Sequence, residues 1–369
     1  MSRATITQVG DNIYVNVNFD SSGPNKDAEG SAAAEYSVTK TIPILSKCDD
    51  YYCSVIRFSI PLDTIPLFIM PILAGQPNPN LTPFIIGITT GGVDFPQPVI
   101  FVSETGAPVP LPPIPFQKIT PYYFVFEYQN LITAINTALA AAFVASGLVG
   151  NTPYFYLNTA TEELHLVVDV ANFAPTATAA VPNPVPLATI FMNSALESYL
   201  SAFQARFVGP SVIGKDYIFN LVRFGLDTTI PPFTAAATQK DFPQEYSTLA
   251  LWSSLRKILI TTNSIPIISE YTPTNNSGIS STLPIITDFV PNIEAAGQSR
   301  AIAFYNPTSQ YRLADMKSSE QLNTIDLKIF WQDLDNNIFP LFISEFQQAN
   351  LKLGFFKKVL YQGGLNLIK

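Results

Sequence analysis

The chain has 369 residues and a net charge of −8, and only 13% of its residues are charged, where about 25% is usual for soluble domains. Its 20 basic residues are dispersed in runs no longer than a pair, which argues against direct nucleic-acid binding, because that binding depends on Lys and Arg that neutralise phosphates. With 47% hydrophobic residues and 31 prolines, the chain can form a large core, and the low charge predicts either a surface covered by neighbouring subunits or a β protein with many proline-rich loops.

The first third of the chain alternates apolar and polar residues in short runs. In residues 13–19, a period of two places Val15, Val17 and Phe19 on one face of a strand. Further short strands are predicted at residues 36–45, 51–60, 67–73, 84–90, 99–103 and 122–128. Residues 21–34 are small and polar and predict a loop or arm. Strands about ten residues apart, with Pro and Gly between them, predict a sandwich or a barrel.

Cysteine usage and the N-terminus bear on the compartment. Cys48 and Cys53 are the two cysteines, and two thiols alone do not make a four-ligand zinc site. A local disulfide is one alternative, but two free, buried cysteines are favoured, and a reducing cytosol suits such a chain. The N-terminus lacks a signal-peptide layout and no run of 18 apolar residues occurs, so neither a secretion signal nor a membrane helix is expected.

The pattern changes in the middle of the chain. In residues 129–146, Leu131, Ile135 and Leu139 share one face of a predicted helix, which Gly147 is placed to end. The remaining predictions here are a hairpin at residues 154–157 and 163–168, a second helix at 193–207 capped by Asn193, a strand at 217–222, and loops at 171–188 and 231–243.

The sequence therefore predicts one sandwich with an insertion. We expect residues 1–128 and 244–369 to form the sandwich, and residues 129–243 to form an inserted mixed α+β segment with two helices. A tandem pair of eight-stranded sandwiches would also fit the length, but the middle segment has too few predicted strands for a sandwich of its own.

Strand patterns return in the last third of the chain. They predict strands at residues 249–252, 258–262, 265–269, 284–290 and 301–305. In the closing stretch, a period of two places Ile325, Leu327, Ile329 and Trp331 on one face of a strand, and residues 335–337 supply turn-forming Asp and Asn. Pro340 lacks a backbone N–H, so residues 338–343 are expected to form an edge strand or a strand that starts late, and residues 351–355 alternate again before two lysines.

The sequence offers little for catalysis. His165 is the only histidine, and it lies in a strand-like run, where a surface or hydrogen-bonded role is favoured over a catalytic one. Residues 213–216 lack the glycine and Ser/Thr of a phosphate-binding loop. Residues 333–337 look like a calcium loop, but Ile338 and Ser344 stand where glycine and glutamate are needed. Neighbouring carboxylates at 49–50 and 162–163 would point to opposite faces of a strand. We therefore predict no catalytic, cofactor-binding or metal-binding residues, and no enzyme.

Several strings in the last third carry a family resemblance. Residues 305–308 (YNPT) and 311–315 (YRLAD) lead into residues 325–333 (IDLKIFWQD). Upstream, residues 244–252 (QEYSTLALW) and 283–289 (LPIITDF) belong to the same set. This order resembles the minor capsid (penton) proteins of polinton-like viruses and virophages.

The resemblance implies a fold and a structural function. It implies an antiparallel jelly-roll at the five-fold vertices of an icosahedral double-stranded DNA virus, in the virion after assembly in the host cytoplasm or nucleus. The implied partners are further copies in a homopentamer and the major capsid protein, with a fibre or host receptor as a further candidate. Residues 21–34 and 362–369 are candidate ties to neighbours, and the insertion is expected to face outward. The alternatives are another jelly-roll capsid component, major or cement, and a glycan-binding fibre or lectin-like module.

Overall fold

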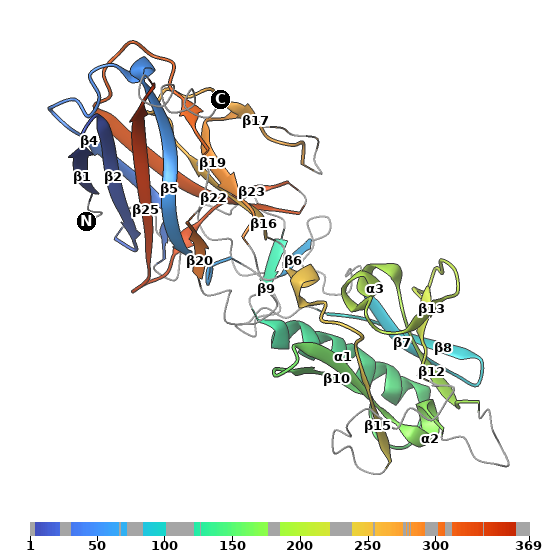
Figure 1. Ribbon diagram of the computed structural model, residues 1–369. Coiled ribbons are helices and arrows are strands. Elements are labelled where there is room, and N and C mark those ends of the chain that lie inside the picture. The colour runs from blue at the N-terminus through green and yellow to red at the C-terminus, as the bar shows by residue number, and fades with distance from the viewer. Residues whose placement is uncertain are drawn as a thin grey trace, which may run out of the picture. The chain divides into compact units, whose positions relative to one another are not determined.

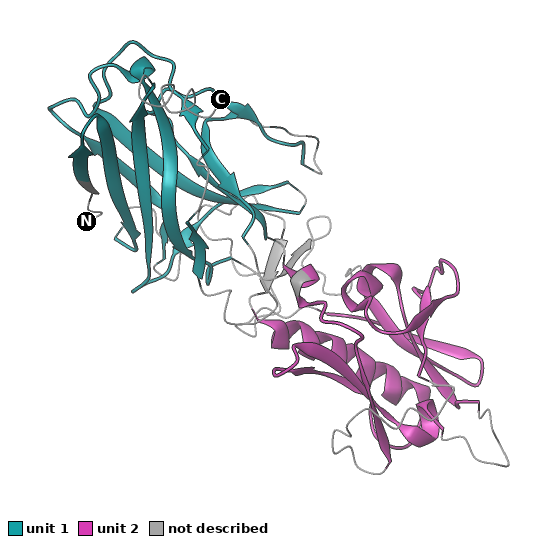
Figure 2. Ribbon diagram, in the orientation of Figure 1, with its two compact units in different colours: residues 1–66, 112–120, 254–369 teal, residues 67–111, 121–253 magenta. Residues whose placement is uncertain are grey.

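The computed structural model divides the chain into two compact units. It describes residues 4–22, 31–65, 68–71, 84–100, 122–125, 127–175, 185–221, 238–253, 255–275, 278, 280, 282–291, 302–306, 312–334 and 336–358. The first unit comprises Met1–Pro66, Pro112–Thr120 and Ser254–Lys369, and the second comprises Leu67–Leu111 and Pro121–Ser253 (Figure 2). Most of the predicted arm at 21–34 and the predicted tail at 362–369 lie outside the described residues.

The first unit is built from two antiparallel sheets. The first sheet has the order β1 (Ala4–Val9), β2 (Asn12–Asp20), β25 (Gln348–Lys357), β5 (Tyr51–Pro61) and β20 (Ile302–Tyr305), with β21 (Ala314–Asp315) also on β5. The second has the order β19 (Ile285–Phe289), β16 (Leu255–Thr261), β22 (Thr324–Asp333) and β23 (Ile338–Pro340), with β4 (Glu35–Thr39) also on β22. Short pairs join β17 (Glu270–Tyr271) to β18 (Thr282–Leu283) and β24 (Phe342–Ile343) to β3 (Ala32–Ala33), and the 3-10 helix η1 (Cys48–Asp50) precedes β5.

The strand order of this unit is that of a jelly-roll. Eight of the described strands, taken in chain order, are β2, β4, β5, β16, β19, β20, β22 and β25. In the first sheet their order is β2, β25, β5 and β20, which are the first, eighth, third and sixth of the eight. In the second sheet their order is β4, β22, β16 and β19, which are the second, seventh, fourth and fifth. Strands from the two ends of the chain, β2 and β25, thus lie side by side (Figure 1). This double Greek-key arrangement confirms the predicted antiparallel jelly-roll sandwich.

The period of two in the sequence produces the core of the jelly-roll. On β22, Ile325, Leu327, Ile329 and Trp331 are all buried, while the three alternate residues at 326, 328 and 330 are only partly covered. The corresponding inward rows are Val15, Val17 and Phe19 on β2, and Leu351, Leu353 and Phe355 on β25. Since apolar rows from both sheets face inward, their burial stabilises the sandwich.

The second unit combines antiparallel sheets with helices. One sheet has the order β13 (Ala205–Phe207), β14 (Tyr217–Phe219), β12 (Ala188–Met192), β7 (Ile85–Thr90) and β8 (Val93–Pro98). Another has the order β10 (Tyr154–Asn158), β11 (Glu163–Asp169) and β15 (Gln239–Pro243), and β6 (Phe68–Pro71) pairs with β9 (Tyr122–Val125). The helices are α1 (Tyr128–Ser146), α2 (Val170–Phe173), α3 (Ser194–Leu200) and the 3-10 helix η2 (Leu249–Trp252).

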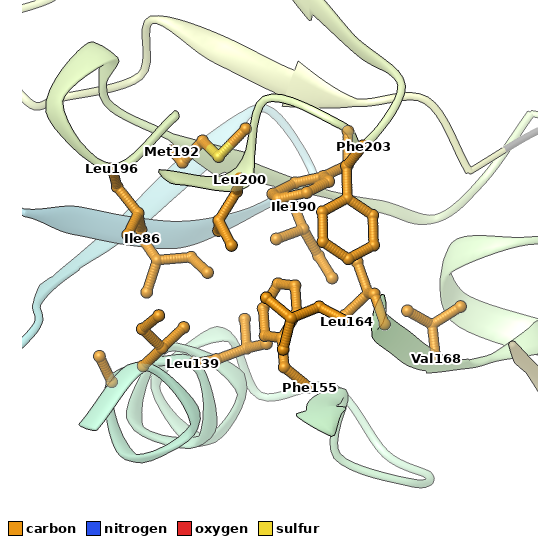
Figure 3. Close-up of a cluster of buried hydrophobic side chains, with 14 of the residues drawn as sticks. Ile86, Leu139, Phe155, Leu164, Val168, Ile190, Met192, Leu196, Leu200 and Phe203 are labelled. Carbon is orange, nitrogen blue, oxygen red and sulfur yellow. The ribbon is translucent and has the colours of Figure 1, made fainter. Parts of the chain in front are cut away.

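Helix α1 is the central element of the second core. It packs against β7, β8 and β10, and its buried face contributes Leu139 to a cluster that also contains Phe155, Leu164 and Ile190 (Figure 3). Gly147, with φ of 68°, ends the helix as predicted. By length and composition the helix could cross a membrane. Its buried apolar residues form part of this core, however, and a helix in a protein core can have the same length and composition.

The structure places the limits of the second unit outside residues 129–243. Strand pairing explains the difference: β7 pairs with β12, with Ile88 opposite Ile190, so β7 and β8 join the second unit and not the sandwich. At the other end, Leu249 and Trp252 are buried in the second core.

Several element predictions were wrong. The predicted strand at 249–252 is the helix η2, and the predicted loop at 231–243 ends in strand β15. The second helix ends at Leu200, and residues 205–207 form β13. In the predicted strand at 265–269, Ile267 makes only an isolated bridge with Met316.

Candidate functional surfaces

His165 lies in a small buried cluster in the second unit. Its Nδ1 lies 2.8 Å from Oδ2 of Asp241, and the hydroxyl of Tyr156 donates to the same oxygen at 3.1 Å. The rings of Tyr156 and His165 stack with centroids 4.8 Å apart. These three residues come from β10, β11 and β15, so the cluster ties together the strands of one sheet.

The two cysteines are free and buried in the first unit. Burial raises the pKa of the Cys53 thiol to about 12. Burial, with the negative charges of Asp49 and Glu320, also raises the pKa of Cys48. Because a thiolate is the reactive form, neither residue is suited to nucleophilic catalysis at neutral pH.

The stretch that looks like a calcium loop forms a hairpin turn. The carboxylate of Asp333 accepts hydrogen bonds from the backbone N–H and the side-chain amide of Asn337, at 2.7 and 2.8 Å. Asn336 adopts φ of 65°, the left-handed conformation that asparagine tolerates in turns. Among the described residues, no group of three or more His, Cys, Asp or Glu side chains is arranged to hold a metal ion.

A β-bulge changes which side chains of β5 face outward. Lys352 of β25 pairs with Arg57, but the next residue, Leu353, pairs with Val55, so Ile56 is an extra residue in β5. Before the bulge Cys53 and Val55 are buried, and after it Phe58 and Ile60 are buried. Without the bulge, the alternation would direct Arg57 and Ser59 into the core.

Next to the bulge, the outer face of the first sheet has a hollow, which we call the sheet hollow. Its volume is about 450 Å³. Two cross-strand rows form its floor: Asn18, Asn350, Ser59 and Phe304 in one, and Asn16, Lys352 and Arg57 in the other. Asn306, after β20, lies at its margin. Strand alternation predicts that these positions face away from the core, but only the register of four strands brings them together.

A second groove, which we call the edge groove, lies beside β1. Among the described strands, β1 pairs with β2 alone, so its other edge is open. The groove has a volume of about 330 Å³ and is lined by Ile6, Gln8 and Ile13 and by residues 40–44. Ile42 is 80% exposed. An open strand edge next to exposed apolar side chains is a typical site of contact with another chain.

The amino-acid sequence is similar to capsid proteins of a virophage. The family model for Sputnik minor capsid protein V18/19 matches residues 13–357. The chain is 27% identical to structural protein V19 of Sputnik virophage over 213 residues, which cover 56% of this chain and 94% of V19. It is 31% identical to protein V18 of the same virophage over 140 residues, which cover 35% of this chain and 83% of V18.

Solved structures show the same likeness. A chain in the cryo-EM structure of the Sputnik virophage matches with a TM-score of 0.78 and 28% identity, over 96% of this chain and 99% of that one. The mavirus penton protein matches with a TM-score of 0.64 and 17% identity, over 94% of this chain and 99% of that one. The second match supports the jelly-roll fold.

Proposed function

The chain belongs to the Sputnik minor capsid protein V18/19 family and is a structural protein of the virion, and from this premise we propose that it is a penton. In this proposal five copies form a ring at each five-fold vertex of an icosahedral double-stranded DNA virus capsid. The head-to-tail contacts of such a ring are heterologous, and the rotation between neighbours closes it.

The number of jelly-rolls is the observation that carries this proposal. In the described residues the chain has one jelly-roll, and its second unit combines α1 with separate antiparallel sheets. A penton subunit with one jelly-roll suits a five-fold ring. The competing candidate, a major capsid protein of the double type, would have two jelly-rolls in each chain. The fold likeness to the mavirus penton protein supports the same choice.

The low charge of the chain supports extensive subunit contact. Faces with few ionisable groups can meet without burying charges that have no partner, which would cost several kcal/mol each. We propose that the edge groove is one such contact with a neighbouring copy, and that the major capsid protein of the same virus covers other faces. A fibre or a host receptor is a further candidate partner.

We also infer that the chain has no catalytic activity. Its only histidine is tied to Asp241 inside the second unit, and burial raises the pKa of Cys53 far above neutral pH. A structural protein of the capsid needs neither group for chemistry.

Light scattering on the purified full chain tests the penton assignment. Each chain has a mass of 40.4 kDa, and the expected particle contains five chains. A trimer would contradict the proposal in favour of a major capsid subunit. A chain that stays monomeric, even when mixed with the major capsid protein of its virus, would also contradict it.

A further inference from the structure

Two cations face each other in the sheet hollow without a carboxylate. Arg57 and Lys352 are directly opposite on β5 and β25, where like charges repel. In the described part of the chain neither side chain forms an ion pair, and the Lys352 amine lies 4.8 Å from the centre of the Tyr14 ring. Most of the described lysines of the first unit behave differently; Lys257, Lys328 and Lys357, for example, each pair with a carboxylate. The hollow is thus a basic site in an acidic protein.

Side-chain amides surround these cations. Asn16, Asn18, Asn306 and Asn350 line the hollow, and within the described residues none of their side chains forms a hydrogen bond. Each amide offers two donors and an acceptor oxygen with two lone pairs. Asparagine is also depleted in strands, so three of these residues on β2 and β25 are not explained by strand propensity.

An aromatic face completes the hollow. Phe304 lies on β20 directly opposite Ser59 and is 72% exposed. Its neighbour Tyr305 stacks on Phe58 with ring centroids 4.9 Å apart. The hollow's volume of about 450 Å³ lies in the range of roughly 300–1,000 Å³ that is usual for small-ligand sites.

We propose that the sheet hollow binds an anionic carbohydrate, such as an oligosaccharide with uronic acid or sulfate groups. Sugar hydroxyls both donate and accept hydrogen bonds, which matches the four amides. The planar guanidinium of Arg57 binds a carboxylate or sulfate through two parallel hydrogen bonds. The apolar face of a sugar ring covers Phe304, which otherwise leaves a large aromatic surface in water.

An acidic peptide fits the hollow less well. A peptide strand binds a sheet by pairing with free backbone groups at an edge. Three of the four strands that form the floor of the hollow, β2, β25 and β5, have a neighbouring strand on both sides, and of these four β20 alone lies at the edge of the sheet. The Asn and basic side chains on β2, β25 and β5 must therefore carry most of the recognition, which favours a ligand rich in hydroxyl groups. The proposal does not depend on the penton assignment, because the residues that carry it belong to one chain.

Isothermal titration calorimetry of the full chain at low salt tests the proposal with four probes. These are a heparin-derived hexasaccharide, tetragalacturonate, neutral maltohexaose and hexaglutamate. We expect at least one acidic sugar to bind more tightly than both maltohexaose and hexaglutamate. Arg57→Ala should weaken that binding by at least about tenfold, because it removes charge-assisted hydrogen bonds to the anionic group, and Phe304→Ala and Asn350→Ala should each weaken it by about threefold or more.

Arg206→Ala is the matched control. Arg206 is exposed on β13 in the second unit, so its loss removes the same charge away from the hollow and should leave binding unchanged. Circular dichroism should show all variants folded, because Arg57, Phe304 and Asn350 are exposed. No binding of either acidic sugar, or equal losses in Arg57→Ala and Arg206→Ala, would overturn the proposal. Equal binding of hexaglutamate with no effect of Phe304→Ala would also overturn it, in favour of an acidic protein segment.

Discussion

Asp326 and Ser264 are hydrogen-bonded to each other in both directions. The backbone N–H of Ser264 donates to the Asp326 carboxylate at 2.6 Å, and the backbone N–H of Asp326 donates to the Ser264 hydroxyl at 2.8 Å. The same carboxylate accepts from the Thr262 hydroxyl and from the backbone N–H of Asn263, both at 2.9 Å. It therefore holds the chain that leaves β16 against β22. Burial raises the pKa of Asp326, but the hydrogen bonds from Ser264, Thr262 and Asn263 outweigh it, and the pKa is lowered overall.

Asp326→Asn should lower the free energy of unfolding by about 1–3 kcal/mol at pH 7, because it weakens several hydrogen bonds to a charged acceptor. Since the folded-state pKa is below the unfolded value of about 3.9, the carboxylate stabilises the fold above that pH and loses its effect as the pH falls through the folded-state pKa. Urea unfolding at pH 7 and at pH 3 should thus show a smaller difference between wild type and variant at the lower pH.

Asp50→Asn is the control for this experiment. Asp50 is exposed, and its only described ion pair is with Lys47 at 3.6 Å, so the change should cost less than about 1 kcal/mol. Equal effects of the two substitutions at pH 7, or a constant effect of Asp326→Asn at both pH values, would show that the Asp326 hydrogen bonds are not what holds this junction.

Gly87→Ala should destabilise the second unit by about 1–3 kcal/mol through overpacking. A Cβ at this position would overlap the buried ring of Phe191 and lie 2.7 Å from the carbonyl oxygen of Phe95. Hydrogen–deuterium exchange should show lost protection in β7 and β12, with the jelly-roll strands unchanged. Val93→Ala, at a 55% exposed position of β8, is the control. Equal loss of protection in β2 and β25 would contradict the division into two units.

The sequence pattern within a segment was enough to predict those helices and strands that have a clear apolar face of their own. The alternation of 325–331 and the helical face of 129–146 were sufficient for β22 and α1. Residues 249–252 look like a strand, but burial of Leu249 and Trp252 with Leu251 exposed follows a helical turn, and the Trp252 indole N–H bonds the carbonyl of Tyr199.

Pairing between distant segments could not be predicted in the same way. Whether β7 joins the jelly-roll or the second unit depends on its register with β12, about a hundred residues later in the chain. The bulge at Ile56 likewise exists only relative to β25. The sheet hollow depends on both the bulge and the register, so no local pattern in the sequence indicates it.

The two thiols should be protected in the folded protein. With both cysteines buried and their pKa values raised, a thiol reagent such as DTNB at pH 8 should react slowly with the native chain and rapidly with both residues after unfolding in urea. The urea sample is the internal control for total thiol. An intact mass two hydrogens below that of the reduced chain would instead reveal a Cys48–Cys53 disulfide and contradict the structure.

Ile42→Glu should break the ring of subunits without unfolding the chain. The side chain is 80% exposed in the single chain, so its replacement should change the free energy of unfolding by no more than about 0.5 kcal/mol. In the proposed contact it would place a charge without a partner beside the open edge of β1, which is costly when water is excluded. Light scattering should show a shift from five chains to one. Val149→Glu, at an 88% exposed position of the second unit, should leave the ring intact. A ring that survives Ile42→Glu would exclude the edge groove from the subunit contact, and that contact would then have to lie on another face of the jelly-roll.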